Sequence, residues 1–121
     1  MRILNLTQHV ATPEQVLAGV VEPKNKEAVQ ALLTFERLPT LPEVQERAAK
    51  LAAIAASYDC AGVMIGGAPY LMAPLELALH DVGCGGKVLY SFSERVSVEQ
   101  SQPDGSVRKV QTFRHAGWVE A

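Results

Sequence analysis

Three short apolar runs along the chain predict the strands of a buried sheet. They extend from Ile3 to Thr7, from Gly62 to Ile65 and from Val88 to Phe92, and apolar residues follow one another in them with little alternation. Strands of a parallel sheet show this pattern because both of their faces are covered. The runs therefore predict a parallel three-stranded core.

Helical patterns fill the segments between the first two runs. Thr12-Pro13-Glu14-Gln15 has the pattern of a capping box with proline at the first helical position, and the short helix that it opens is expected to end by Gly19. A second helix is predicted from Lys26 to about Phe35. The clearest helix is predicted from Thr40 to Ser57, because apolar residues recur there at helical spacing and charged residues lie off that face.

A fourth helical pattern opens directly after the glycine turn Gly66-Gly67 and stops at Gly83. Pro74 complicates this helix, because a proline well inside a helix removes a backbone hydrogen bond. We therefore expect the regular helix to start near Leu71 or Met72, or to be bent.

The C-terminal part changes from helical spacing to alternation. Val96-Ser97-Val98-Glu99 alternates, Pro103-Asp104-Gly105 has the composition of a turn, and the residues from Val107 to Trp118 are again typical of a strand. We predict an antiparallel hairpin from about Val96 to Val119, with Gly105 at positive φ.

The order of these elements predicts a single α/β domain over residues 1–121. The expected fold is a compact Rossmann-like three-layer domain with a mostly parallel sheet and a C-terminal antiparallel β-hairpin. The net charge of −2 argues against binding to long nucleic acids, which need a basic surface, but allows a small anionic ligand. With neither a membrane span nor a signal peptide in the sequence, we expect a cytoplasmic protein without a membrane partner.

The sequence contains few candidate ligands for a metal or a cofactor. Cys60 and Cys84 are the two cysteines, and because no CxxC spacing occurs we expect free thiols in a reducing compartment. Histidines and carboxylates do not cluster at metal-ligand spacing, and neither the P-loop motif nor GxGxxG is present. The sequence thus predicts neither a metal site nor a cofactor.

Polar residues and glycines follow the first two predicted strands, at the edge where an open parallel sheet binds its ligands. Thr7, Gln8 and His9 come after the first strand, and Gly66-Gly67-Ala68 after the second. Glycines there let a ligand approach the backbone, and amides at the start of the next helix suit phosphate or another anion. The alternative is purely structural: the glycines form a packing turn, and His9 only bonds the loop backbone.

Other candidate residues have two interpretations each. Tyr70 could stack on a base or belong to the core, and Arg95 could neutralise an anionic ligand or be solvated. His80 is expected at the surface near a helix end, and His115 is expected to be half-buried without an assigned role. The spacing reveals no nucleophilic set of serine, histidine and aspartate.

Several segments spread over most of the chain carry a resemblance to a known family. They are Leu6-Thr7-Gln8-His9 with Thr12-Pro13-Glu14-Gln15, the glycine turn leading into Tyr70-Leu71-Met72, and the tail segments Arg95-Val96-Ser97-Val98-Glu99, Pro103-Asp104-Gly105 and Phe113-Arg114-His115. In these segments the chain resembles the small CRISPR-associated ring nucleases, which are related to the CRISPR-associated Rossmann fold. The resemblance implies a homodimer in antiviral defence that binds a cyclic oligoadenylate second messenger and cleaves it without metal.

Under this hypothesis the products end in 2′,3′-cyclic phosphates, and the first two βα turns line the ligand pocket. The residues implied are catalytic His9 and Gln8, with Thr7, Gly66, Gly67, Ala68, Tyr70 and Arg95 binding the ligand. Two alternatives stay open at this point. The chain could be a nucleotide-sensing module that binds without cutting, or a structural or interaction protein of a mobile element, in which the glycine turn serves packing alone.

Overall fold

The structure is a computed structural model that describes residues 1–83 and 86–121 as a mixed α/β fold. Cys84, one of the two cysteines expected to be free thiols, lies outside the described residues, while Cys60 is a half-buried free thiol. In chain order the elements are β1 (Ile3–Leu6), α1 (Pro13–Leu17), β2 (Val20–Val21), α2 (Lys26–Leu33), α3 (Leu41–Ala56), β3 (Gly62–Ile65), α4 (Pro69–Asp81), β4 (Lys87–Ser101) and β5 (Val107–Glu120).

The strands form one five-stranded, mostly parallel sheet in the order β2-β1-β3-β4-β5. Strand β1 runs parallel to both β2 and β3, and β3 runs parallel to β4. The register pairs Leu6 with Ile65 and Ile65 with Tyr90, so β1 and β3 end side by side, and their ends lie level with Tyr90 of β4. The predicted parallel three-stranded core is confirmed.

Local capping explains where the helices begin. The Thr12 hydroxyl accepts from the Gln15 N–H at 3.2 Å, and the Gln15 side-chain oxygen accepts from the Thr12 N–H at 3.0 Å, which completes the predicted capping box of α1. At α3 the Thr40 hydroxyl caps the helix by accepting from the Glu43 N–H at 3.3 Å. Helix α2 ends at Leu33, earlier than predicted, because Thr34 adopts an extended backbone.

Helix α4 differs from the expectation at its start. It begins at Pro69, where proline suits the first helical position, and it continues through Pro74. Pro74 lacks the N–H that would bond the Tyr70 carbonyl, yet the surrounding turns remain helical. A start near Leu71 or Met72 was therefore wrong.

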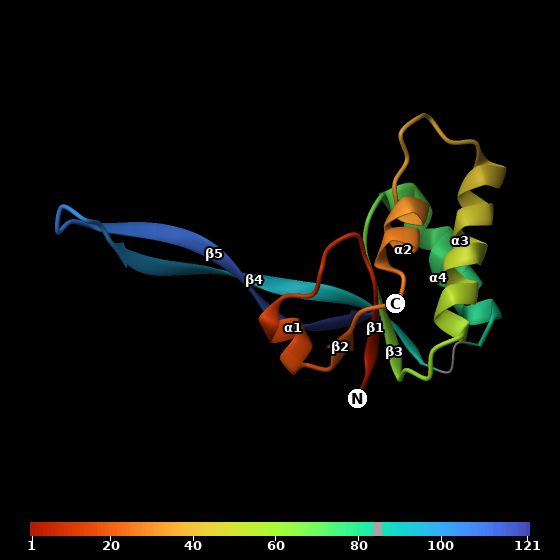
Figure 1. Cartoon of the computed structure of the whole chain (residues 1–121), viewed down its shortest axis with the longest axis horizontal. Helices are drawn as coiled ribbons and strands as arrows, with labels where there is room; N and C mark the ends of the chain where they lie inside the picture. The colour runs from red at the N-terminus through yellow and green to blue at the C-terminus, as the bar shows by residue number, and fades with distance from the viewer. Residues whose placement is uncertain (84–85) are drawn as a thin grey trace.

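The core has two parts, one on each face of the sheet. The larger part packs α2, α3 and α4 against the sheet, and Figure 1 shows these three helices gathered together. Its members include Leu4, Leu6, Val29, Leu33, Leu51, Val63, Ile65, Leu71, Leu75, Leu79 and Val88. On the opposite face Ile3, Val20, Met64 and Leu89 form a smaller cluster, with Ala11 and Trp118 packed against it. Neighbouring strand residues thus enter opposite clusters, as the continuous apolar runs predicted.

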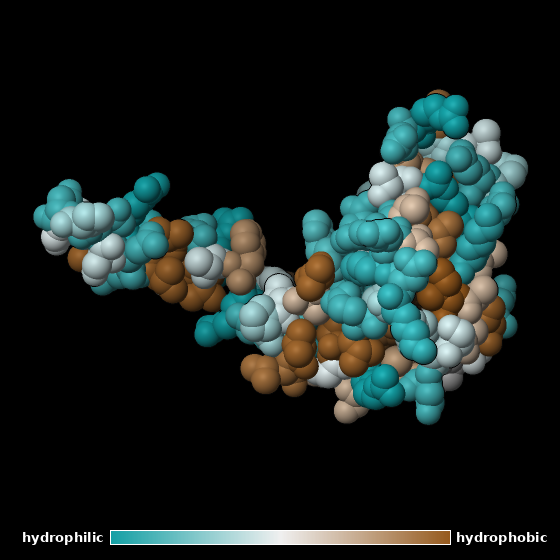
Figure 2. Space-filling model, in the orientation of Figure 1, coloured by the Kyte–Doolittle hydropathy of each residue, from teal (hydrophilic) through white to brown (hydrophobic). Residues whose placement is uncertain are grey.

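Strands β4 and β5 continue far beyond the rest of the sheet as a two-stranded projection (Figure 1). We call residues 93–115 the arm. The ladder runs from the pair Leu89 and Glu120 to the pair Ser101 and Val107, so the predicted third strand and the first half of the hairpin are one strand. Gly105 has φ of 86° in the turn, as expected. Figure 2 shows apolar side chains exposed along this projection.

A β-bulge marks the point where the arm leaves the body of the domain. Phe92 pairs with Gly117, but the next residue, Ser93, pairs with His115. Ala116 is therefore an extra residue in β5, and it changes which β5 side chains share a face with β4.

Candidate functional site

A cavity of about 480 Å³ opens where β1 and β3 end, beside residues 90–93 of β4. Its lining comprises Thr7, Gln8, His9, Val10, Thr12, Gln15, Met64, Ile65, Gly66, Gly67, Tyr90, Ser91 and Ser93. The carboxyl ends of parallel strands meet at one edge of a sheet, and ligands bind in the crevice outside them. The structure thus brings together Thr7, Gln8, His9, Gly66 and Gly67 among the residues singled out from the sequence.

Three other candidates lie outside this lining. Ala68 is the residue that precedes α4, next to the glycine turn. The Tyr70 ring packs edge-on against Phe35, with 5.2 Å between ring centroids. Arg95 belongs to the arm, where its guanidinium lies 5.7 Å from the centre of the Phe113 ring. Within one chain, neither Tyr70 nor Arg95 reaches the cavity.

The loop after β1 is held by Asn5, a fully buried polar residue in the middle of an apolar strand. Its amide nitrogen donates to the His9 carbonyl at 2.8 Å and to both carboxylate oxygens of Glu22 at 3.1 Å. Its amide oxygen accepts from the Thr7 N–H at 2.9 Å and from the Thr7 hydroxyl at 2.7 Å. Asn5 therefore fixes the backbone that presents His9, and sequence reasoning had given it no role.

Glu22 and Lys26 complete this support from the segment after β2. The Lys26 ammonium lies 3.1 Å from the Glu22 carboxylate and donates to the carbonyls of Thr7 at 2.7 Å and His9 at 3.0 Å. Burial raises the pKa of Glu22, but hydrogen bonds from the Ala11 N–H, Asn5 and Lys26 outweigh it, so the pKa lies below its ordinary value. Glu22 is therefore a carboxylate at neutral pH, as this network requires.

Hydrogen bonds within the protein already use the donors of two candidates. The Gln8 amide nitrogen donates to the Leu33 carbonyl at 3.2 Å and to the Thr34 hydroxyl at 3.1 Å. The Thr7 hydroxyl donates its proton to Asn5 and lies 3.2 Å from the His9 carbonyl. Gln8 can thus offer a ligand only its side-chain oxygen, and Thr7 acts chiefly by shaping the loop.

His9 and Gly67 present the exposed groups of the cavity. The His9 side chain is exposed at the rim and makes no hydrogen bond to any residue in 1–83 or 86–121. Gly67 has φ of 148°, a conformation that residues with a side chain rarely adopt. The glycine turn therefore leaves the backbone accessible to a ligand beside the exposed His9 imidazole.

Ser91 and His115 form a pair that the sequence did not reveal. The Ser91 hydroxyl lies 2.8 Å from His115 Nδ1 and accepts from the Gln15 amide nitrogen at 3.1 Å. Both residues are half-buried, and Ser91 lines the cavity. Counting outward from the Pro103-Asp104-Gly105 turn places Ser93 opposite His115, so a signal existed in the sequence, but the bulge that follows did not show there.

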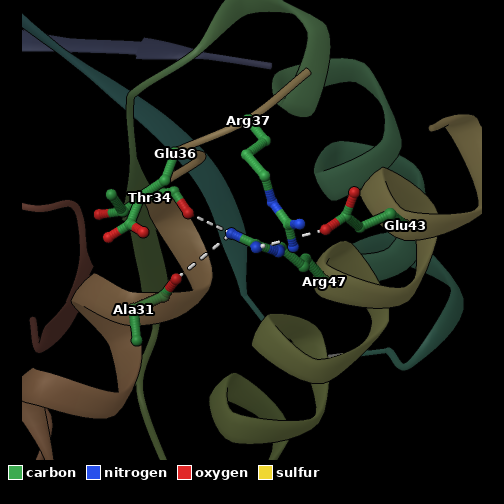
Figure 3. A pocket seen from close by; sticks show the side chains of 6 residues that line it. All are labelled: Ala31, Thr34, Glu36, Arg37, Glu43 and Arg47. Atoms are coloured by element: carbon green, nitrogen blue, oxygen red, sulfur yellow. Dashed lines mark hydrogen bonds and ion pairs between the residues drawn. The ribbon is translucent and has the colours of Figure 1, made fainter. Parts of the chain in front are cut away.

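A second cavity, of about 220 Å³, lies between the end of α2 and the start of α3 (Figure 3). Its central residue, Arg47, donates to the carbonyls of Ala31, at 3.3 Å, and Thr34, and lies 3.5 Å from the Glu43 carboxylate. The Arg47 guanidinium also stacks on the Phe35 ring at 4.3 Å. These contacts give Arg47 a structural role, because they satisfy the last carbonyls of α2.

Neither a cluster of metal-ligating side chains nor a membrane-spanning helix is found in the part of the chain that the structure describes. No three or more histidine, cysteine, aspartate or glutamate residues gather there closely enough to hold a metal ion. None of the described helices has the length and hydropathy that crossing a bilayer requires.

Comparison with known proteins adds one finding. A family model described as that of the uncharacterized protein MJ1673 family matches residues 1–119. Curated proteins and solved structures gave no match. The family match spans the cavity, its supporting network and the arm.

Proposed function

The chain belongs to the uncharacterized protein MJ1673 family, and because that description states no activity, we propose from the site that the protein binds and cleaves a cyclic oligoadenylate. The observation that carries the proposal is the cavity at the carboxyl edge of the parallel sheet. It joins the exposed His9 imidazole to the Gly66-Gly67 backbone and to an apolar wall that suits a base. Its volume of about 480 Å³ falls within the range of about 300–1,000 Å³ of small-molecule sites.

The cleavage that we propose needs no metal, because the substrate supplies the nucleophile. A ribose 2′-hydroxyl attacks the adjacent phosphorus, the bond from phosphorus to the next 5′-oxygen breaks, and a 2′,3′-cyclic phosphate and a 5′-hydroxyl result. His9 takes the proton of the attacking hydroxyl or gives one to the leaving oxygen. The Gly66 and Gly67 amides hold the phosphate oxygens, and positioning supplies much of the rate.

A homodimer would complete this site. None of the described residues that line the cavity is lysine or arginine, although the proposed ligand is anionic. The arm carries four such residues, Arg95, Arg108, Lys109 and Arg114, all of them exposed. We propose that the arm of each subunit lies over the cavity of the other, where Arg95 neutralises the bound phosphates.

We also propose that the α/β fold is a Rossmann-like three-layer domain. The support is that both faces of the sheet are buried, and that α1 and the loop before it border the smaller cluster. The sheet order β2-β1-β3-β4 also puts a change of direction at β1, where the cavity opens, as in nucleotide-binding sheets.

A nucleotide-sensing module that binds without cutting is the second candidate. The hydrogen bonds of Gln8 favour it, because its amide protons are already donated to Leu33 and Thr34. The amide of Gln8 then cannot donate to a ribose hydroxyl or to a leaving oxygen, and His9 alone would have to support catalysis.

Single-turnover cleavage of cyclic tri-, tetra- and hexaadenylate in EDTA tests these candidates. We expect cleavage to 2′,3′-cyclic phosphate ends, and His9→Ala should slow it about 10²-fold or more while binding is retained. The matched control is His80→Ala, which removes an exposed histidine at the end of α4. Gly67→Val should weaken binding, because its backbone conformation disfavours a side chain.

The outcomes separate the two candidates. Binding of one of these rings without cleavage would favour the sensing module. Loss of cleavage in EDTA would refute the metal-free mechanism, and wild-type rates in His9→Ala would refute the role of His9. Absence of any binding would refute both candidates.

A further inference from the structure

We propose that Ser91 is a nucleophile activated by His115, and that this pair hydrolyses neutral carboxylic esters in the same cavity. The activity goes beyond the proposed cleavage of cyclic nucleotides and does not depend on it. The evidence is a hydrogen-bond chain that runs from the start of α1 through Gln15 and Ser91 to His115.

The capping box of α1 fixes the orientation of the Gln15 side-chain amide. Its oxygen accepts from the Thr12 N–H at 3.0 Å, as the capping box of α1 requires. The nitrogen of the amide therefore faces Ser91, at 3.1 Å. An amide nitrogen only donates, so the Ser91 oxygen must accept this hydrogen bond.

The Ser91 hydroxyl proton can be donated to His115. A hydroxyl has one proton to donate and two lone pairs that accept. Gln15 occupies one lone pair, and the Ser91 proton can be donated to His115 Nδ1, which lies 2.8 Å from the oxygen. In this proposal His115 has the tautomer with its proton on Nε2, which leaves the second lone pair of Ser91 for an electrophile. This is the hydrogen-bond arrangement of a serine nucleophile and its general base.

The His115 imidazole is held in place by its neighbours on the β4–β5 ladder. The rings of His115 and Trp118 are tilted against each other, with 4.4 Å between their centroids. Pairing of Ser91 with Trp118 and of Ser93 with His115 puts these side chains on one face of the β4–β5 ladder. A fixed base beside the hydroxyl lowers the cost of orienting the pair for reaction.

The lining of the cavity suggests the class of ester. Ser91 lines it together with the apolar side chains of Val10, Met64 and Ile65. No lysine or arginine is found among the described lining residues, so a single chain offers no cation to an anionic substrate. Where no arm of a second subunit covers the cavity, a neutral acyl ester fits this environment better than a charged one.

The reaction balances with water as the only co-reactant. Ser91 Oγ attacks the ester carbonyl carbon while its proton passes to His115 Nδ1. The carbon–oxygen bond to the alcohol then breaks, and His115 returns the proton to the departing alcohol. Water attacks the acyl-serine with loss of a proton to His115, the carboxylic acid leaves, and Ser91 recovers its proton.

Labelling with phenylmethanesulfonyl fluoride tests the nucleophile without a known substrate. We expect one covalent adduct, mapped by peptide mass spectrometry to Ser91, and no adduct at that position in Ser91→Ala. His115→Gln keeps a hydrogen-bond acceptor but removes the base, so labelling should slow about 10²-fold or more. Hydrolysis of p-nitrophenyl acetate should fall in parallel in both variants.

Two controls keep the test specific. Ser97→Ala changes an exposed serine of the arm and should label like the wild type. Unfolding midpoints of all variants verify that each is folded at the assay temperature. Absence of an adduct at Ser91, or wild-type labelling of His115→Gln, would overturn the proposal and leave a purely structural role for the pair. Cleavage of cyclic oligoadenylates is measured separately, so the failure of either activity is recognisable.

Discussion

Strand β4 runs through both the body of the domain and the arm, but apolar side chains are buried at its start in the body and more exposed in the arm. In β4, Val88 is 1% exposed and Leu89 is 4% exposed in the body, whereas Val98 in the arm is 42% exposed. Body strands are sandwiched between two apolar clusters, but the arm is a ribbon of two strands, which is marginally stable by itself in water. The difference teaches that most of the buried apolar surface lies in the body, while the arm leaves apolar side chains exposed for the contact with a second subunit that we propose.

Truncation of a core leucine should give the largest effect. Leu75 is fully buried between α4 and the sheet, so Leu75→Ala should lower the free energy of unfolding by about 2–5 kcal/mol. Phe113→Ala in the arm removes a larger side chain that is 70% exposed, and it should change the value by less than about 0.5 kcal/mol. Urea denaturation at low protein concentration measures both. Equal losses would show that the arm is part of the folding core.

Asn5→Ala should give the next largest effect. The variant removes the fully buried Asn5 amide and leaves the half-buried Thr7 N–H and the partly exposed Glu22 carboxylate without this partner, which costs about 1–3 kcal/mol of stability. Ser97→Ala in the exposed arm is the matched polar control, with an expected change below about 0.5 kcal/mol. Thermal or urea unfolding compares the two, and a neutral Asn5→Ala would mean that the network contributes no net stability.

A smaller effect should appear in self-association. Val96, Val98 and Val110 lie on the face of the arm opposite to Arg95, and we expect the proposed homodimer to bury this apolar face as well. Val98→Thr should raise the dimer dissociation constant about tenfold with little change in unfolding at low concentration. Val82→Thr is the control, an equally exposed valine after α4, at 43%. Sedimentation analysis decides, and a monomer at every concentration would contradict the dimer.

The smallest expected effect is on the pH dependence of stability. The pKa of Glu22 is lower in the folded protein than its ordinary value of 4.5. Its carboxylate thus contributes stability above about pH 4.5, and the contribution is lost as the pH falls through the folded pKa. The side chain is 34% exposed, so the contribution should stay below about 1 kcal/mol. In Glu22→Gln the fall in unfolding free energy between pH 6 and pH 3 should be smaller than in the wild type.

Much of the body could be predicted because its signals are local. Apolar runs gave the three parallel strands, and the capping residues Thr12 and Thr40 gave two helix starts. Pro74 misled the prediction of α4, because the rest of the helix tolerates one missing hydrogen bond. The exposure of the arm could not be predicted, since alternation shows that a strand has two faces but not what covers them.

The candidate site was predictable only where it follows from strand direction. The rule that ligands bind at the carboxyl ends of parallel strands placed His9 and Gly67 in one cavity. Asn5 and Glu22 are 17 positions apart in the sequence, and Ser91 and His115 are 24 positions apart. Local sequence patterns do not predict contacts between residues this far apart. Tyr70 packs on Phe35 for the same reason, because the loop before α3 brings that ring to α4.

The extra residue in β5 sets which side chains of the arm share a face with those of the body. If the register of the body continued past Phe92 without the bulge, Ala116 would pair with Ser93, and His115 would pair with Glu94. A single-residue shift moves every side chain of a strand to the opposite face. The bulge, and not only the identity of the residue, therefore decides on which face of the ribbon the His115 side chain lies.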